Sequence, residues 1–153
     1  MITKIFTPKE NLIVTTSTPL YKLVAIILIV NKFNAISVSK LQVYMWGLQN
    51  KENQKKLKIW KEQDRVTEVP WVLEDDIMPI ISQCIDNHFL KLETNKSKKV
   101  VVSLGLNANH FLQEIEKLEL VNELNNSLTY IGKLTDKMLE NLSLIHISEP
   151  TRL

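Results

Sequence analysis

The sequence predicts a mainly α-helical fold that includes one small β-hairpin. Apolar residues recur at helical spacing along much of the chain, most clearly after Ile77, where they follow at offsets of 3, 4, 7 and 8 positions, with His88 at offset 11 on the same face. Two short apolar segments at 89–93 and 99–104 flank a polar turn, which is the pattern of a hairpin. A chain of 153 residues can bury a real core, so we expect a single domain over residues 1–142.

The first predicted helix runs from Pro19 to Phe33. It begins with Ser-Thr-Pro at 17–19, which signals a helix start because a hydroxyl group can accept a hydrogen bond from a free amide and proline fits the first helical position. Its β-branched residues also allow a buried strand, but its length favours a helix. A second helix is predicted to end near Leu48, with Ser37 or Ser39 as its N-cap.

The next segment, residues 50–63, is polar and rich in lysine. We expect an exposed helix or an extension there. Its apolar anchors are Leu57, Ile59 and Trp60. Residues 64–73 are predicted to form an extended connector, because Pro70 disfavours the helical conformation of Val69.

The most regular helical pattern covers residues 74–88. Asp75 or Asp76 is a natural N-cap for this helix. Pro79 then falls within the first turn, where its missing amide hydrogen costs little. The apolar face of the helix is predicted to include both Cys84 and His88.

Beyond this helix we expect the hairpin and then two helices. The hairpin would have its turn at 94–97 and end at Gly105. A helix starting at Asn107 or Asn109 is predicted to extend through Leu120, and a last helix to cover 125–142. The order of elements is therefore that of a winged-helix-like domain with additional C-terminal helices.

Several segments also resemble a known protein family. They are PLYKLVAIILIVNKF, ISVSKLQVYMWGL and VPWVLEDDIMPIISQCIDNHFLKLE. Together with the segment after the hairpin they are similar to the middle component of bacterial ABC-three-component systems, over most of residues 17–142. The resemblance implies a small winged-helix subunit encoded beside an ABC ATPase of the SMC and Rad50 kind, in a defence system against phage or plasmids. It implies no active-site residues, and Lys51–Lys61 has no counterpart in it.

The last residues, 143–153, read SLIHISEPTRL, which resembles the translation of a sequencing adapter. We expect this tail to be non-native and the natural reading frame to be interrupted near Leu142. An ordinary C-terminal tail is the alternative. His146 accordingly carries no functional weight.

Catalytic and cofactor motifs are not recognised in the sequence. Its glycines, Gly47, Gly105 and Gly132, are isolated, whereas a P-loop needs a glycine-rich turn before Lys and Ser or Thr. Cys84 and His88 are the one plausible metal-ligand pair, but core packing is the better explanation of both. We therefore expect a non-enzyme without metal or cofactor.

Composition points to the cytoplasm. The net charge is only +2, and the single cysteine suits a reducing compartment. The longest apolar run, Leu23–Val30, is far short of the roughly 20 residues of a membrane span, and we expect no secretory signal. His110, at a predicted helix start without a nearby acidic residue, is expected to be structural or exposed.

The predicted helix 74–88 is unsuited to reading DNA. No lysine or arginine lies between Val66 and Leu90, against five acidic residues, and three of these, Glu74, Asp75 and Asp76, form the leading turn. Carboxylates there repel phosphate, although helix capping already explains them better than acid-base catalysis does. We expect these three residues to bind a protein partner.

Two lysine-rich strips remain as candidates for contact with nucleic-acid phosphates, although a solvated surface is the simpler explanation of each. The candidates are Lys91, Lys96, Lys98 and Lys99 at the hairpin, and Lys55 and Lys58 in the polar segment. Two functions follow as hypotheses. The first is an adaptor that bridges an SMC-like ATPase to an effector subunit or to a second copy of itself. The alternative is a transcription regulator that binds operator DNA as a dimer.

Overall fold

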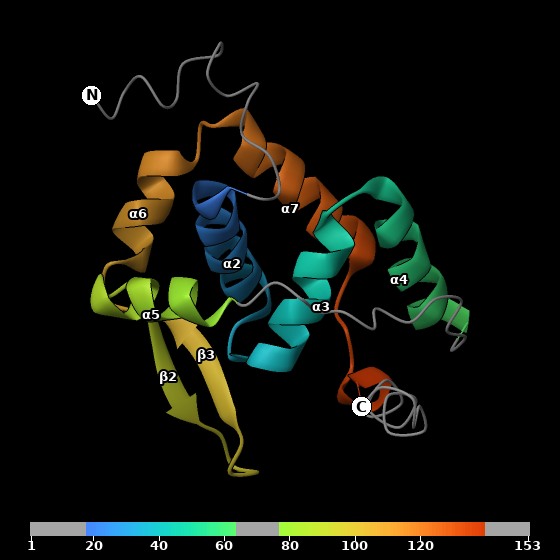
Figure 1. Cartoon of the computed structure of the whole chain (residues 1–153), viewed down its shortest axis with the longest axis horizontal. Helices are drawn as coiled ribbons and strands as arrows, with labels where there is room; N and C mark the ends of the chain where they lie inside the picture. The colour runs from blue at the N-terminus through green and yellow to red at the C-terminus, as the bar shows by residue number, and fades with distance from the viewer. Residues whose placement is uncertain (1–17, 64–76, 140–153) are drawn as a thin grey trace.

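The computed structural model describes residues 18–63 and 77–139 and is mainly helical with one small antiparallel sheet (Figure 1). The elements are α2 (Pro19–Phe33), β1 (Ile36–Ser37), α3 (Val38–Leu48), α4 (Lys51–Gln63), α5 (Met78–Asp86), β2 (Leu90–Thr94), β3 (Val100–Leu104), α6 (Ala108–Ile115) and α7 (Glu119–Ile131). Residues 136–139 are also helical. The predicted fold class, mainly α with a small hairpin, is confirmed.

Helix α2 is the centre of the fold. Every residue from Val24 to Val30 is at most 2% exposed, so the helix is buried on all sides and its apolar composition needs no polar face. It contacts α3, α5, α7 and β3, and Figure 1 shows these elements around it. Its start is as predicted, because the Thr18 hydroxyl accepts a hydrogen bond from the Tyr21 amide at 3.3 Å and Pro19 opens the helix.

Helices α3 and α4 form an antiparallel pair beside α2 (Figure 1). Ser37, one of the two predicted caps, accepts a hydrogen bond from the Lys40 amide at 3.2 Å. The lysine-rich segment is a helix, α4, whose inner side buries Leu57 and Trp60. Gly47 lets α3 approach this side, because a side chain at that position would collide with Leu57.

The sheet has one more strand than the sequence predicts. Its order is β1-β3-β2, and both pairings are antiparallel. The two-residue strand β1 places Ile36 beside Val102, where both side chains are buried. A strand of two residues has no alternation to detect, which explains why sequence patterning missed it.

The predicted helix 74–88 is wrong at its C-terminal end. Helix α5 ends at Asp86, and His88 has a left-handed backbone with φ 62° and an exposed side chain. The reason is that the chain reverses here into β2, and the His88 carbonyl accepts a hydrogen bond from the Asn107 amide at 2.8 Å. Pro79 does lie in the first turn, as predicted. The predicted N-cap, Asp75 or Asp76, is wrong as well, because α5 begins at Met78 and Ile77 is its N-cap residue. Glu74, Asp75 and Asp76 themselves lie outside the described residues.

The first of the predicted C-terminal helices starts as expected, with Asn107 as the N-cap residue of α6, but the other boundaries are wrong. The helix is interrupted before Leu118, whose extended backbone separates α6 from α7. Helix α7 ends at Ile131 and is followed by Gly132 with φ 76°. Asn125, the predicted start of the last helix, therefore lies inside α7. The break lets α6 and α7 each turn an apolar side inward, although the intervening residues contain no glycine or proline that would signal it.

Gly105 allows two backbone segments to lie close together at the junction between α5 and the sheet. A side chain there would meet the His88 carbonyl group and lie 3.0 Å from the Leu90 amide nitrogen, which are backbone atoms that cannot rotate away. We predict that Gly105→Ala lowers the free energy of unfolding by about 2 kcal/mol or more, because the junction must open. Urea denaturation followed by circular dichroism measures this. An unchanged midpoint would show that the junction is looser than described.

Candidate interaction surfaces

The exposed side of α5 is polar but carries no cation. Ser82, Gln83 and Asp86 face solvent, and Met78 at the start of the helix is 43% exposed. Cys84 and Ile81, on the opposite side, are fully buried. The helix that precedes the hairpin therefore presents uncharged polar groups, one carboxylate and a thioether.

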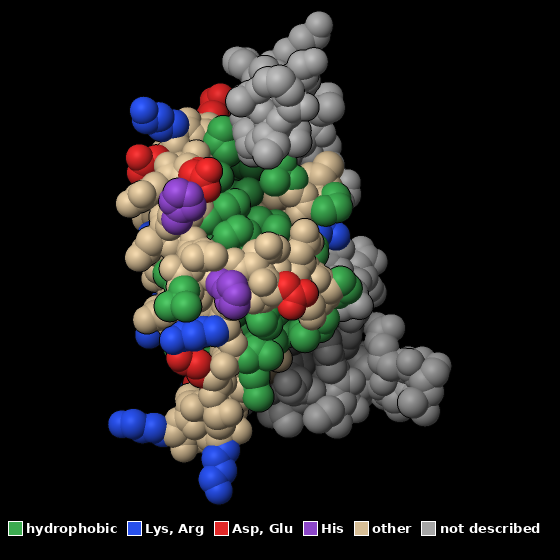
Figure 2. All heavy atoms as spheres, turned by 90° about the vertical axis from the view of Figure 1, so that its left-hand side faces the viewer, with side chains coloured by type: hydrophobic (Ala, Val, Ile, Leu, Met, Phe, Trp, Pro, Cys, Tyr) green, Lys and Arg blue, Asp and Glu red, His purple; other side chains and the backbone are tan. Residues whose placement is uncertain are grey.

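The hairpin lysines are exposed and gather mainly at the turn. The turn between β2 and β3 is shaped by the Asn95 side chain, whose oxygen accepts hydrogen bonds from the Ser97 and Lys99 amides. Lys96, Lys98 and Lys99 project from this turn, and Figure 2 shows lysine side chains at that end of the molecule. The structure therefore brings three of the four predicted hairpin lysines together.

Lys91 lies apart from the turn, on β2. Its ammonium group is 2.9 Å from a Glu93 carboxylate oxygen, and the Ser103 hydroxyl donates to the other oxygen at 3.0 Å. The hydrogen bond from Lys91, followed by that from Ser103, lowers the pKa of the Glu93 carboxyl group. Lys91 and Glu93 thus form an ion pair on the surface of the strand.

The α4 lysines lie on the other side of the molecule from the hairpin (Figure 1). Lys58 donates a hydrogen bond to the Tyr130 carbonyl at 3.0 Å, and its ammonium group lies 4.5 Å from the centre of the Tyr130 ring. A cation at the C-terminal end of α7 is favourable because the helix dipole is negative there. Lys58 therefore has an intramolecular role, whereas Lys55 is exposed.

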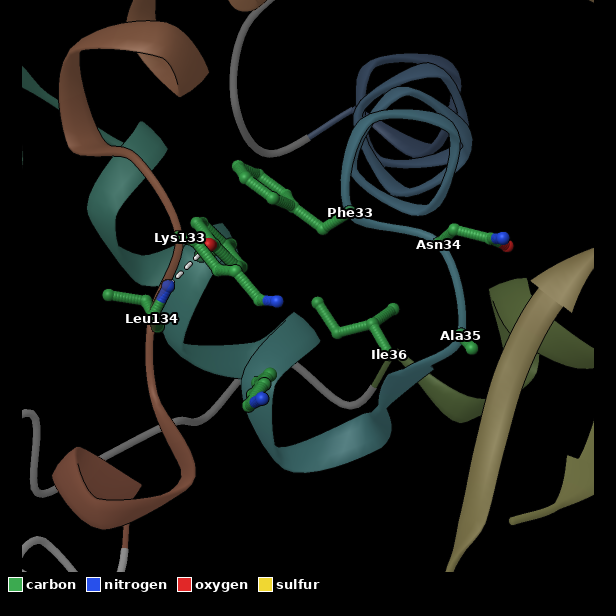
Figure 3. Close-up of a pocket in the computed structure, with 8 residues that line it drawn as sticks. Phe33, Asn34, Ala35, Ile36, Lys133 and Leu134 are labelled. Carbon is green, nitrogen blue, oxygen red and sulfur yellow. Dashed lines mark hydrogen bonds between the residues drawn. The ribbon is translucent and has the colours of Figure 1, made fainter.

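A small cavity of about 130 Å³ lies between the end of α2, the start of α3 and the segment after α7 (Figure 3). The Phe33 ring stacks on the Tyr44 ring with centroids 4.7 Å apart, and Phe33, Ile36 and Lys133 point into the space. Asn34 points away from it. Sequence reasoning did not find this cavity, because its walls come from segments about 100 residues apart.

Lys40, one of the residues that line this cavity, forms an ion pair. Lys40 lies 2.8 Å from Asp136, and this hydrogen bond and charge, with smaller contributions from Lys99 and Lys133, lower the pKa of the Asp136 carboxyl group. Asp136 itself is well exposed. The Asp136 carboxylate thus partly neutralises the charge of the lysines around it.

The Tyr44 hydroxyl group ties α3 to the segment after α7. It donates to the Gly132 carbonyl at 2.7 Å and accepts from the Leu134 amide at 3.0 Å. Burial raises the pKa of Tyr44 to about 12, and the hydrogen bond from Leu134 opposes this rise. The hydroxyl group is therefore a structural bridge.

A second, shallow hollow of about 340 Å³ lies between α2, α6 and α7. Leu28, Leu112 and Val121 are its apolar lining residues. The polar residues of its wall are Asn31, Asn109, Gln113, Glu116 and Asn125. No pair of acidic groups or nucleophile with its base occurs among these lining residues.

The candidate metal and acid-base residues do not converge. Cys84 is fully buried, and burial raises its pKa to about 11, whereas His88 is exposed, so the prediction that both share an apolar face is wrong for His88. His110 does have an acidic neighbour, because its Nε2 lies 3.5 Å from Glu114 one helical turn later. Within residues 18–63 and 77–139 no group of three His, Cys, Asp or Glu side chains is placed to hold a metal ion.

Two further findings concern membrane spans and similarity to known proteins. In the part that the structure describes, no helix has both the length and the apolar character needed to cross a membrane. Comparisons with protein-family models, with curated proteins and with solved structures found no match.

The Tyr44 bridge gives a prediction for stability. We expect Tyr44→Phe to lower the free energy of unfolding at pH 7 by about 1–2 kcal/mol, because it leaves two backbone groups without a partner. Wild-type stability should also fall as the pH rises from 10 towards about 12, since the unfolded hydroxyl group ionises before the folded one, and the variant should lose part of this dependence. Urea denaturation across this pH range measures both effects. Tyr130→Phe, at an exposed ring, is the control, and equal losses in the two variants would contradict the bridge.

Proposed function

We propose that this chain is a non-catalytic adaptor of winged-helix type, the middle subunit that binds an SMC- or Rad50-like ABC ATPase in a bacterial defence system in the cytoplasm. The order α2, β1, α3, α5, β2, β3, with the strand order β1-β3-β2, supports the winged-helix part of this proposal. Helix α4 is an addition between the second and third helices of that plan. The resemblance of the sequence to the middle component supports the partner.

The observation that carries the proposal is the absence of any cation on α5. In a DNA-reading winged helix, the helix before the hairpin enters the major groove. Lysine or arginine side chains there neutralise the phosphates, and lysine, arginine or amide side chains contact the bases. The described residues of this region, 77–90, contain no lysine or arginine. Gln83 and the exposed Met78 suit a protein surface, where polar and apolar contacts are mixed.

This proposal predicts that charge on α5 blocks assembly. We expect Ser82→Arg with Gln83→Arg to weaken binding of the ATPase encoded beside this gene at least tenfold, because two bulky cations would stand in the interface. Co-expression, co-purification and titration of the purified proteins measure this. Lys96→Glu, Lys98→Glu and Lys99→Glu together serve as the control and should bind normally. A soluble ATPase that ignores the wild-type chain would refute the adaptor role.

The alternative function is a transcription regulator, and the part of the chain that could bind DNA is the lysine turn, which we define as Lys96, Lys98 and Lys99. Lys96, Lys98 and Lys99 are exposed and close in sequence, so they suit contact with phosphates but carry no base-reading geometry. Under the adaptor proposal they give at most weak, sequence-independent binding of nucleic acid.

We predict that double-stranded DNA binds this chain weakly and that its affinity falls steeply as the salt concentration rises. Replacing Lys96, Lys98 and Lys99 by glutamate should abolish the binding, because three phosphate contacts become repulsive. Fluorescence anisotropy at several salt concentrations measures this, with the α5 arginine variant as the control. Binding that depends on the DNA sequence and survives the loss of the lysine turn would favour the regulator.

A further inference from the structure

We propose that two copies of this chain associate through the free edge of β2, pairing their β2 strands antiparallel about a two-fold axis at Leu92. This inference does not depend on the proposed ATPase, since it concerns only the chain and a second copy of itself. It rests on the open edge of the sheet, the direction of its backbone groups and the order of its charges.

The edge is open in the described structure. The strand order β1-β3-β2 leaves β2 with one neighbour, and Figure 1 shows no labelled element beside its outer side. All residues from Lys91 to Thr94 are exposed, and Figure 2, which looks from this side, leaves the hairpin in view. An unpaired edge of this kind is a template for a further strand.

The hydrogen bonds at both ends of the hairpin show which backbone groups of β2 are free. The Gly105 amide donates to the Phe89 carbonyl at 2.8 Å, and the Asn95 amide donates to the Lys99 carbonyl at 2.9 Å. Because bonding alternates along an antiparallel ladder, the odd-numbered positions of β2 bond to β3. The amide and carbonyl groups of Leu90, Leu92 and Thr94 therefore point to the open edge.

A two-fold axis at Leu92 uses these free groups without a mismatch. Leu92 would pair with Leu92 of the second copy, and Leu90 with Thr94, so that each of these pairs joins residues with outward backbone groups. An axis at Lys91 or Glu93 would pair only two of these three residues and leave Thr94 or Leu90 without a partner in the second β2 strand. The backbone thus favours one register among its immediate neighbours.

The charges favour the same register. With the axis at Leu92, Lys91 of each copy lies opposite Glu93 of the other, in a pair without backbone hydrogen bonds, where side chains approach most closely. An axis at Lys91 or Glu93 would place like charges opposite each other. The ion pair that exists within one strand, at 2.9 Å, would become part of a four-charge cluster.

The exposed apolar side chain of Leu92 would be partly covered as well. Leu92 is 48% exposed and Val100 is 54% exposed, and their register with β3 and β2 places both on the side that also carries the buried Leu90 and Val102. In the proposed dimer the two Leu92 side chains would lie next to each other. Val100 lies on β3, one strand away from the second copy, and would stay exposed.

Charge exchange tests this register directly. Wild-type protein should be in equilibrium between monomer and dimer in sedimentation equilibrium. Lys91→Glu and Glu93→Lys should each weaken self-association about tenfold or more, because like charges then face each other twice. A one-to-one mixture of the two single variants should associate with each other, and the double variant Lys91→Glu with Glu93→Lys should regain the wild-type dissociation constant. Lys96→Glu, the same change outside the paired strand, is the control.

The variant Leu92→Pro tests the proposed backbone hydrogen bonds between the two β2 strands. Proline removes an amide that points outward, so the hairpin keeps its own ladder while the central bonds of the dimer are lost. This variant should be monomeric, with the circular dichroism spectrum and unfolding midpoint close to those of the wild type; should it not fold, the charge variants decide alone. A wild-type protein that stays monomeric at several hundred micromolar would overturn the proposal. So would a dimer that persists in the single charge variants, or a double variant that fails to recover.

Discussion

The burial of α2 on all sides is the constraint on which the rest of the structure depends. A helix without a polar face is stable in water only if other elements cover its whole circumference. In this chain α3, α5, α7 and β3 provide that cover, although they come from three separate parts of the sequence. The hairpin is therefore held by its base, through Leu90 and Val102, while its far end extends from the core and is free to carry charge.

Much of this arrangement follows from local signals in the sequence. The bounds of α2, the cap at Ser37 and the two strands of the hairpin are set by residues next to one another, so patterning identifies them. The end of α5 and the break before Leu118 depend instead on contacts made across the fold. His88 adopts a left-handed backbone because its carbonyl group meets Asn107, which lies 19 positions further along, and no spacing near His88 indicates this.

The candidate surfaces also divide into those set by local sequence and those set by contacts across the fold. The lysine turn could be placed from the sequence, because all its members belong to one hairpin. The role of Lys58 could not, since it depends on the end of α7, more than 70 positions away, where its charge meets free carbonyl groups and a ring. The Tyr44 bridge and the cavity beside it are of the same long-range kind. Long-range contacts of this type turn residues that look like surface charge into parts of the framework.

The hairpin and helix α5, which precedes it, carry three different surfaces. Separate residues form the exposed side of α5, which carries one carboxylate and no cation, the charged edge of β2, and the lysine turn. An antiparallel pairing of two β2 edges involves positions 90–94 and leaves the turn at 95–99 outside the register. It would also direct the two turns to opposite ends of the paired strands, because the strands run in opposite directions. A dimer of this kind would leave both lysine turns outside the paired strands, which suits an adaptor that has more than one partner.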